Sequence, residues 1–169
     1  MISSKPFSWL RVIHKAWKCP KRRYHFWWRL ASYWYQNETR FMKSAALRIN
    51  RNLISKYGTE IELGARIAPG LVITHHHGIV INGAVVIGHS FRIRQNTTIG
   101  ITGGNPGQLP ISIVIGDNVS IGASSCIIAD QINIGDNVVI GAMSFINKDI
   151  PGNRTVFTEK TMKIIVNEH

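Results

Sequence analysis

The sequence lacks several features that mark secreted, membrane-spanning and zinc-binding proteins. It has only two cysteines, Cys19 and Cys126, which are too far apart for a CxxC or zinc-ligand spacing. They indicate a reducing compartment or carry no information about redox. No run of about eighteen apolar residues could span a bilayer, and the N-terminal stretch has no clean apolar region of the kind found in a signal peptide. We therefore expect a cytoplasmic protein, at most peripheral at the inner face of the membrane.

Acidic residues are nearly absent from the first third of the chain. Residues 1–58 contain thirteen Lys and Arg but a single acid, Glu38, whereas residues 59–169 contain seven basic and eight acidic residues. The net charge of +11 is thus the sum of +12 and −1. All five tryptophans also lie before position 35. These differences define a basic, aromatic N-terminal appendage on a chain that is otherwise nearly neutral.

The appendage has apolar residues at helical spacing. We expect one helix between Phe7 and Trp17, ended by Cys19–Pro20 because proline disfavours helix in the residue before it. A second helix is expected from Tyr24 to Tyr35. A third should follow Asn37–Thr39 and end at Gly58.

Three interpretations of residues 1–58 remain open. The helices could form a cap that packs on the rest of the chain or on a partner subunit. Basic amphipathic helices with Trp and Tyr also suit the anionic surface of a membrane. Nucleic acid is not expected as a partner, because no recognised motif accompanies the charge.

The rest of the chain carries an aliphatic residue at every sixth position. The positions are Ile61, Ile67, Ile73, Ile79, then Ile81, Ile87, Ile93, Ile99, then Ile115, Ile121, Ile127, and finally Ile134, Ile140, Ile146. A period of six fits neither a helix nor a simple strand, but it is typical of a parallel β-helix. Three hexads would form one triangular coil, and successive coils would stack at about 4.8 Å. Burying each isoleucine stabilises such a fold by about 1.5–3 kcal/mol.

The period breaks in three places, and breaks in a repeat are where function is usually added. The frame slips by two residues at Ile79 to Ile81, beside three consecutive histidines. Residues 102–112 are rich in turn formers and must leave the coil as a protruding loop. A single extra residue between positions 127 and 134 indicates a bulge or a widened corner.

The hexads resemble those of the hexapeptide acyltransferases, as in Ile115-Gly-Asp-Asn-Val-Ser and Ile134-Gly-Asp-Asn-Val-Val. This resemblance implies a coil that is left-handed, against the usual rule for parallel crossovers. The predicted fold is therefore mainly β, a left-handed parallel β-helix with a short α-helical appendage. We divide the chain into the appendage, the β-helix at 59–152, and a C-terminal cap at 153–169 that would cover the open strand edges.

The consecutive histidines His75, His76 and His77 are the sharpest local signal. In an extended segment neighbouring side chains alternate, so His75 and His77 share one side and His76 takes the other. Zinc needs three or four converging ligands, and no Cys or second His cluster stands nearby, so no metal is expected. Two interpretations remain: inert histidines at a turn, or a catalytic imidazole, whose unperturbed pKa of about 6.5 suits a general base.

Residues 60–81 resemble the active-site segment of the serine acetyltransferases, in which an aspartate, one methylene shorter than glutamate, precedes the catalytic histidine by fifteen residues. Glu60 and His75 occupy the matching positions. The resemblance covers residues 60–151 and not the appendage. It implies that acetyl-CoA is the co-substrate, that His75 is the general base, and that Glu60 holds the imidazole in the correct tautomer, as in triad logic.

The resemblance also implies a homotrimer, in which the pantetheine arm of acetyl-CoA lies in a groove between two subunits. Small residues there would admit the arm to the backbone, and the matching positions are Gly100, Gly103, Gly104, Ala123 and Ala142. Small residues also permit tight corners in the coil, so no single one of them identifies a CoA-binding groove. Lys160, with Lys148, Arg154 and Lys163, could bind the CoA phosphates, the alternative being a solvated basic face.

The sequence departs from the serine acetyltransferases in Leu109, which stands where that family has a second histidine that helps bind serine. The paired histidines, Phe91–Arg94 and Val156–Lys160 resemble acetyltransferases of bacterial exopolysaccharide clusters, such as the colanic acid type. That resemblance implies an acceptor hydroxyl on a sugar or lipid-linked glycan, and Arg94, Gln95 and His76 are the candidate acceptor contacts. The alternatives are a serine or other small-molecule O-acetyltransferase and, from another class, a β-helix scaffold without activity.

Overall fold

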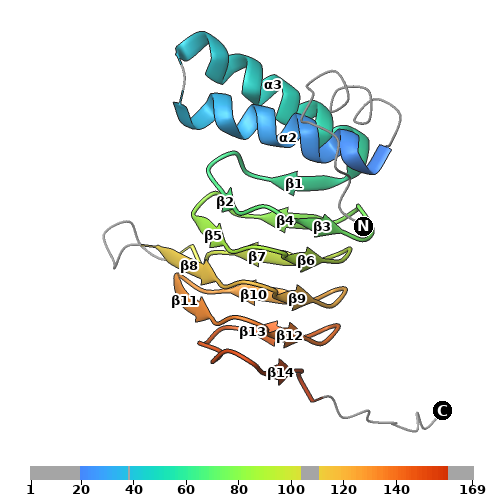
Figure 1. Cartoon of the computed structure of the whole chain (residues 1–169), viewed down its shortest axis with the longest axis vertical. Helices are drawn as coiled ribbons and strands as arrows, with labels where there is room; N and C mark the ends of the chain where they lie inside the picture. Colours follow the sequence, from blue (N-terminus) through green and yellow to red (C-terminus); the bar gives the residue numbers. More distant parts are fainter. Residues whose placement is uncertain (1–19, 38, 104–110, 160–169) are drawn as a thin grey trace, which may run out of the picture.

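The computed structural model describes residues 20–37, 39–103 and 111–159, and shows two helices stacked on one end of a β-helix (Figure 1). The helix expected at residues 7–17 lies outside the described residues, as do Gly104 and Lys160. The helices are α2 (Pro20–Asn37) and α3 (Arg40–Tyr57). The strands are β1 (Thr59–Ile61), β2 (Arg66–Ile67), β3 (Val72–Ile73), β4 (Ile79–Ile81), β5 (Val85–Ile87), β6 (Arg92–Ile93), β7 (Thr98–Gly100), β8 (Ser112–Ile115), β9 (Ser120–Ile121), β10 (Cys126–Ile128), β11 (Gln131–Ile134), β12 (Val139–Ile140), β13 (Phe145–Ile146) and β14 (Thr155–Val156).

The strands form three parallel sheets, and each full coil contributes one strand to each sheet. The first sheet has the order β1-β4-β7-β10-β13, the second β11-β8-β5-β2, and the third β14-β12-β9-β6-β3. The pairing is in register, so that Ile61 pairs with Ile81, Ile81 with Ile99, and Ile99 with Ile127. The three sheets are the faces of a prism, which confirms the predicted parallel β-helix.

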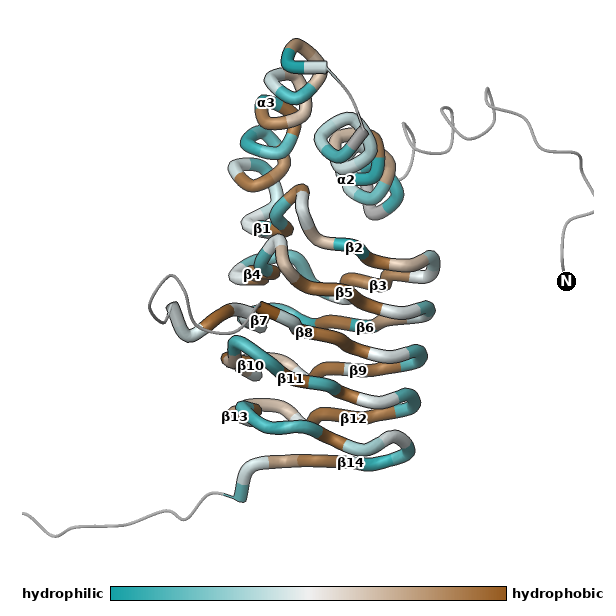
Figure 2. Tube along the Cα trace, turned by 90° about the vertical axis from the view of Figure 1, so that its left-hand side faces the viewer, coloured by the Kyte–Doolittle hydropathy of each residue, from teal (hydrophilic) through white to brown (hydrophobic). Residues whose placement is uncertain are grey.

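The interior of the prism is filled by the residues that recur every sixth position. All fourteen of them are at most 5% exposed. The strand residues between them point outward, as the alternating burial of β8 and β11 shows. In Figure 2 the strands carry most of the hydrophobic colour and the corners are paler or hydrophilic. The hexad period therefore predicted the core correctly.

Asparagine and glycine allow the sharp corners between the second and third sheets. Gly70, Ser90, Asn118, Asn137 and Asn153 stack there, and all have φ between 57° and 94°. Asparagine tolerates this left-handed conformation better than most residues. Its amides also join successive coils, because Asn118 Nδ2 donates to Asn137 Oδ1 at 3.2 Å and Asn137 Nδ2 donates to Asn153 Oδ1 at 3.0 Å. We call this prism edge the asparagine edge.

The two helices form a cap on the first coil. The Trp28 indole and the Asn50 amide both donate to the Ile61 carbonyl, at 3.1 and 3.3 Å. Gln36 donates to the Leu63 carbonyl at 2.9 Å, and Arg29 donates to the Ile67 and Ala68 carbonyls. The outermost strand edge of a sheet presents unpaired carbonyls, and these side chains satisfy them. Residues 20–57 thus adopt the packed helical arrangement that was one of the three interpretations.

The boundaries of α3 agree with the sequence signals, whereas α2 is longer than the expected helix from Tyr24 to Tyr35. Thr39 is the N-cap residue of α3, although its side chain makes no capping hydrogen bond. Gly58 ends α3 in the left-handed conformation, with φ of 60°, and its N–H donates to the Ile54 carbonyl. On α3, Ala46 and Leu53 are buried, and Met42 and Ile49 are half-buried. None of the described helices is long and apolar enough to cross a membrane.

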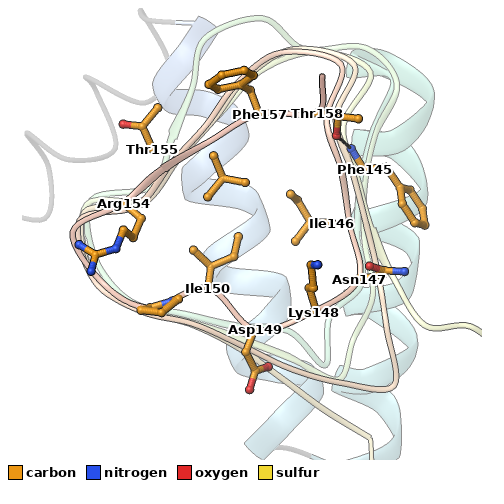
Figure 3. Close-up of a pocket in the computed structure, with 12 residues that line it drawn as sticks. Phe145, Ile146, Asn147, Lys148, Asp149, Ile150, Arg154, Thr155, Phe157 and Thr158 are labelled. Atoms are coloured by element: carbon orange, nitrogen blue, oxygen red, sulfur yellow. Dashed lines mark hydrogen bonds between the residues drawn. The ribbon is translucent and has the colours of Figure 1, made fainter. Parts of the chain in front are cut away.

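The coil continues past residue 152. β14 pairs with β12, and an isolated bridge joins Ile134 to Ile150. This last coil surrounds a cavity of about 440 Å³ at the open end of the prism. Figure 3 shows Ile146 and Ile150 inside the coil and Phe145 pointing away from it. The rest of the expected C-terminal cap, residues 160–169, lies outside the described residues.

The other irregularities fall at a single edge, between the first and second sheets. The extra residue lies at the corner between β10 and β11, and the loop predicted at 102–112 falls between β7 and β8. Ser112 belongs to β8, and residues 104–110 lie outside the described residues. Thr102 marks the start of the loop, where the Thr102 N–H donates to Asp130 Oδ1 at 3.0 Å and its hydroxyl donates to Oδ2. We call this the loop edge.

Candidate functional site

The two-residue frame slip lies at the third edge of the prism, between the third and first sheets, which we call the histidine edge. Seven residues separate the paired positions Ile73 and Ile81 in the first coil, whereas five separate their partners Ile93 and Ile99 in the second. The slip is therefore an insertion at one corner. It forms the turn at residues 74–78, here called the histidine turn, directly beneath the helices.

Within the histidine turn, His75 and His77 are exposed and His76 is half-buried. This difference in exposure agrees with the predicted alternation, but the turn is not the extended segment on which that prediction was based. His77 has φ of 97° and Gly78 has φ of 64°. A Cβ at Gly78 would lie against the Asn96 side chain of the next coil and 3.2 Å from its Cα, so a side chain at this left-handed position would be strained.

His76 points into the helical cap. Its Nδ1 lies 3.0 Å from the hydroxyl oxygen of Thr59, which is fully buried at the start of β1. Its ring centroid lies 4.8 Å from that of Tyr24 and 5.1 Å from that of Tyr57. The structure therefore places this candidate acceptor contact among residues of α2, α3 and β1. No sequence motif pointed to Thr59, Tyr24 or Tyr57, because they are brought together only by packing of the helices on the coil.

His25 of α2 lies close enough to interact electrostatically with this cluster. Burial lowers the pKa of His25 to about 4, with smaller contributions from the charges of His76 and Arg29. Burial likewise raises the pKa of Tyr24 well above its usual value. Both side chains are therefore uncharged at neutral pH, and burial between α2 and the first coil favours the uncharged form.

Glu60 occupies the middle of β1, pairs with Val80, and is exposed. Within the described part of the chain, no hydrogen bond or ion pair joins Glu60 to His75. The pairing of these two residues, inferred from the resemblance, stays a prediction.

The histidine edge also carries other candidate residues. The Thr74 N–H donates to the Ile93 carbonyl, which places Arg94 in the coil next to the histidine turn. Gln95, Ala123 and Ala142 then stack in one column, since the Ser124 N–H donates to the Gln95 carbonyl and the Met143 N–H to the Ala123 carbonyl. At about 4.8 Å for each of the three steps from the histidine turn, this column is roughly 14 Å long.

The remaining small residues lie elsewhere. Gly100 ends β7 at the loop edge, and Gly103 follows it with φ of 74° and open space around it. The candidate cofactor contacts are thus divided between two edges of one chain.

A different ionisable pair lies away from the histidine turn, on the asparagine edge. Asp117 accepts a hydrogen bond from the His89 N–H at 2.6 Å and lies 3.3 Å from His89 Nδ1. The backbone hydrogen bond is the main cause that lowers the pKa of Asp117. Among the described residues, no group of three or more His, Cys, Asp or Glu could hold a metal ion.

Comparisons with known proteins agree with the fold. The family described as "Hexapeptide repeat of succinyl-transferase" matches residues 112–148. Serine acetyltransferase 1, chloroplastic, of Arabidopsis thaliana is 39% identical over 122 residues, covering 72% of this chain and 37% of that protein. The putative colanic acid biosynthesis acetyltransferase WcaB of Escherichia coli K12 is 39% identical over 110 residues, covering 64% of this chain and 65% of that protein. The chain therefore spans little more than a third of the Arabidopsis protein.

The coil also superposes on solved structures. Serine acetyltransferase of Brucella abortus strain S19, in complex with coenzyme A, matches with a TM-score of 0.72 at 28% identity. The match covers 83% of this chain and 54% of that one. A coil of the opposite hand would not superpose in this way, so the two β-helices wind with the same hand.

Proposed function

This chain is a hexapeptide-repeat protein like the serine acetyltransferases, and we propose that it is an acetyl-CoA-dependent O-acetyltransferase with His75 as the general base. The observation that carries the proposal is the histidine edge. One column of the prism holds the histidine turn, then Arg94 and Gln95, then Ala123 and Ala142. A base, polar side chains for an acceptor, and small residues for a thioester arm follow one another along it.

The proposed reaction is a direct acyl transfer. The His75 imidazole takes the proton of the acceptor hydroxyl as its oxygen attacks the acetyl carbonyl carbon. The new C–O bond forms, the C–S bond to CoA breaks, and the imidazolium returns its proton to the leaving sulfur. In this proposal the Glu60 carboxylate keeps the His75 imidazole in the tautomer that accepts the proton, which is the role of the acid in a triad. The exposure of His75 leaves it accessible to both substrates.

The acceptor has two candidates. Serine is supported by the similarity to serine acetyltransferases, in sequence and in structure. A sugar hydroxyl is supported by the similarity to WcaB, which covers more of the relative's length. Arg94 beside the histidine turn supplies a cation and several hydrogen-bond donors that could bind either acceptor.

An acceptor screen separates these candidates. Purified protein is incubated with acetyl-CoA, and release of the CoA thiol is followed with serine or with nucleotide-linked and lipid-linked sugars. Release with serine alone would assign the serine reaction, and release only with a linked sugar would assign the polysaccharide reaction. If no acceptor gives CoA release and acetyl-CoA does not bind, the enzymatic proposal is wrong and the scaffold alternative stands.

We also propose that the active form is a homotrimer. Gly100, at the loop edge, pairs with Ile128, which comes five residues after Ala123 of the histidine edge. The first sheet therefore separates the two edges by roughly 16 Å. An acetyl-CoA arm that runs along one edge cannot follow the other edge of the same chain, whereas edges of two neighbouring copies can flank one groove. The mass in solution should be that of three 19.0 kDa chains. A fully active monomer would contradict this.

The outer face of the helical cap is the proposed contact with an anionic membrane. Residues 20–57 contain nine basic residues and one acid. Arg40, Arg48 and Arg51 are exposed on α3, beside Phe41, which is 83% exposed. We expect sedimentation with vesicles of anionic lipid at low salt, loss of binding at high salt, and weakened binding after Arg48→Gln with Arg51→Gln. Equal binding to neutral vesicles would exclude the electrostatic contact.

A further inference from the structure

We propose that His76 is a positioning residue, clamped by the helical cap so that the histidine turn presents His75 in one orientation. The inference rests on the proposed function, because it assigns a role in that same site. It makes α2 and α3 part of the catalytic apparatus as well as a cover for the first coil.

The first half of the clamp is a buried hydrogen bond. Thr59 is fully buried, and its hydroxyl lies 3.0 Å from His76 Nδ1. Removing one partner of a buried hydrogen bond leaves the other partner unsatisfied, so this bond holds the turn in place. The bond joins β1 to the middle of the inserted turn, seventeen residues later in the chain.

The second half of the clamp is aromatic. The Tyr24 ring, fully buried on α2, is inclined at 57° to the His76 ring with a centroid distance of 4.8 Å. The Tyr57 ring, at the end of α3, lies 5.1 Å away at 49°. Tilted ring contacts of this kind favour a defined geometry as well as burial. The imidazole of His76 is therefore held from both helices at once.

The other neighbour of His75 is also restrained. His77 has φ of 97°, a strained conformation that persists only where the surroundings enforce it. Gly58, at the end of α3, approaches it so closely that a Cβ there would lie 3.0 Å from His77 Nδ1. The helical cap thus restrains the conformation of His76 and His77, while the side chain of His75 stays exposed.

The consequence for catalysis follows from geometry. A base must lie within hydrogen-bond reach of the proton it removes, and a displacement of about 1 Å can lower the rate about 10²-fold. The column of small residues proposed for acetyl-CoA begins with Ala123, two coils from the turn. Loosening the clamp should therefore lower kcat and leave the KM for acetyl-CoA nearly unchanged.

The test compares Thr59→Val with Thr59→Ser. Valine has nearly the shape of threonine but no hydroxyl, whereas serine keeps the hydroxyl. We expect Thr59→Val to lower kcat by about tenfold or more, with the KM for acetyl-CoA within about twofold, and Thr59→Ser to recover most of the rate. Equal rates for the two variants would overturn the proposal.

A matched control separates positioning from general loss of stability. Thr97 is also a fully buried threonine at the histidine edge, but its hydroxyl donates to backbone carbonyls, that of Gly122 at 3.3 Å and that of Gln95 at 3.5 Å. Thr97→Val should lower the melting temperature to a similar extent while keeping kcat. If Thr97→Val and Thr59→Val reduce kcat equally, the effect is general and His76 has no positioning role.

Hydrogen–deuterium exchange supplies a readout that does not depend on turnover. Amides of residues 74–79 should exchange faster in Thr59→Val than in the wild type, in Thr59→Ser or in Thr97→Val. If no acceptor is ever found but exchange changes in this way, the clamp stands and the proposed function fails. If exchange at the turn is the same in all four proteins, the clamp is wrong whatever the activity.

Discussion

The indole nitrogen of Trp28 donates a hydrogen bond across 3.1 Å to the carbonyl oxygen of Ile61, thirty-three residues later in the chain. Ile61 is in the first strand of the β-helix, and its carbonyl faces the end of the prism, where no further coil can pair with it. The contact shows how a tryptophan-rich helix and an isoleucine-rich coil form one structure. The helical cap supplies the donors that another coil would otherwise supply.

Trp28→Phe should lower the free energy of unfolding by about 1 kcal/mol, because it removes one donor from a buried carbonyl. The cost is at the low end of the usual range, since Asn50 donates to the same oxygen. Urea unfolding followed by circular dichroism measures the change. Trp27→Phe is the control, as that indole is 37% exposed. A larger effect at Trp27 would contradict this role of Trp28.

His75→Ala should lower turnover by about 10²–10⁴-fold if the imidazole is the general base. The rate of CoA release is measured with whichever acceptor the screen identifies. His89→Ala is the matched control, because His89 is exposed on the asparagine edge. Unchanged turnover in His75→Ala would remove the assignment of the base.

Ala123→Leu should raise the KM for acetyl-CoA at least several-fold, because a larger side chain would hold the arm away from the backbone in the middle of the column. Titration calorimetry with CoA checks the same effect without an acceptor. Asn133→Leu, exposed in the middle of β11 on the second sheet, should bind CoA as the wild type does. Normal CoA binding by Ala123→Leu would place the cofactor elsewhere.

Acid should destabilise the protein through His25. Burial lowers its pKa in the folded state to about 4, against 6.5 when exposed, so the unfolded chain binds the proton more tightly. His25 therefore costs no stability above about pH 6.5, and its protonation favours unfolding progressively as the pH falls from 6.5 towards 4. The melting temperature should fall over this interval.

The His25→Gln variant isolates that contribution. It should melt at a temperature that depends less on pH between 6.5 and 4 than that of the wild type. His89→Gln, which replaces a largely exposed histidine, should keep the wild-type dependence. If His25→Gln and the wild type have parallel profiles, His25 does not cause the acid sensitivity.

The sequence predicted the coil because its signal is local and repeated. Every inward residue is followed six positions later by another, so Ile61 or Ile121 could be assigned to the core without knowledge of any distant contact. The same reasoning located the insertion at the histidine turn and the alternation of His75, His76 and His77. Helix ends were equally accessible, since Thr39 and Gly58 act through the backbone next to them.

Tertiary structure alone decided what surrounds each of these elements. Sequence placed His76 opposite His75, but only the packing of two helices on the first coil brought Tyr24, Tyr57 and Thr59 against it. It also decided that Ala123 shares an edge with the histidine turn and Gly100 does not. The physical reason is that a six-residue period defines the conformation of each hexad, whereas contacts between residues many positions apart depend on how whole coils and helices stack.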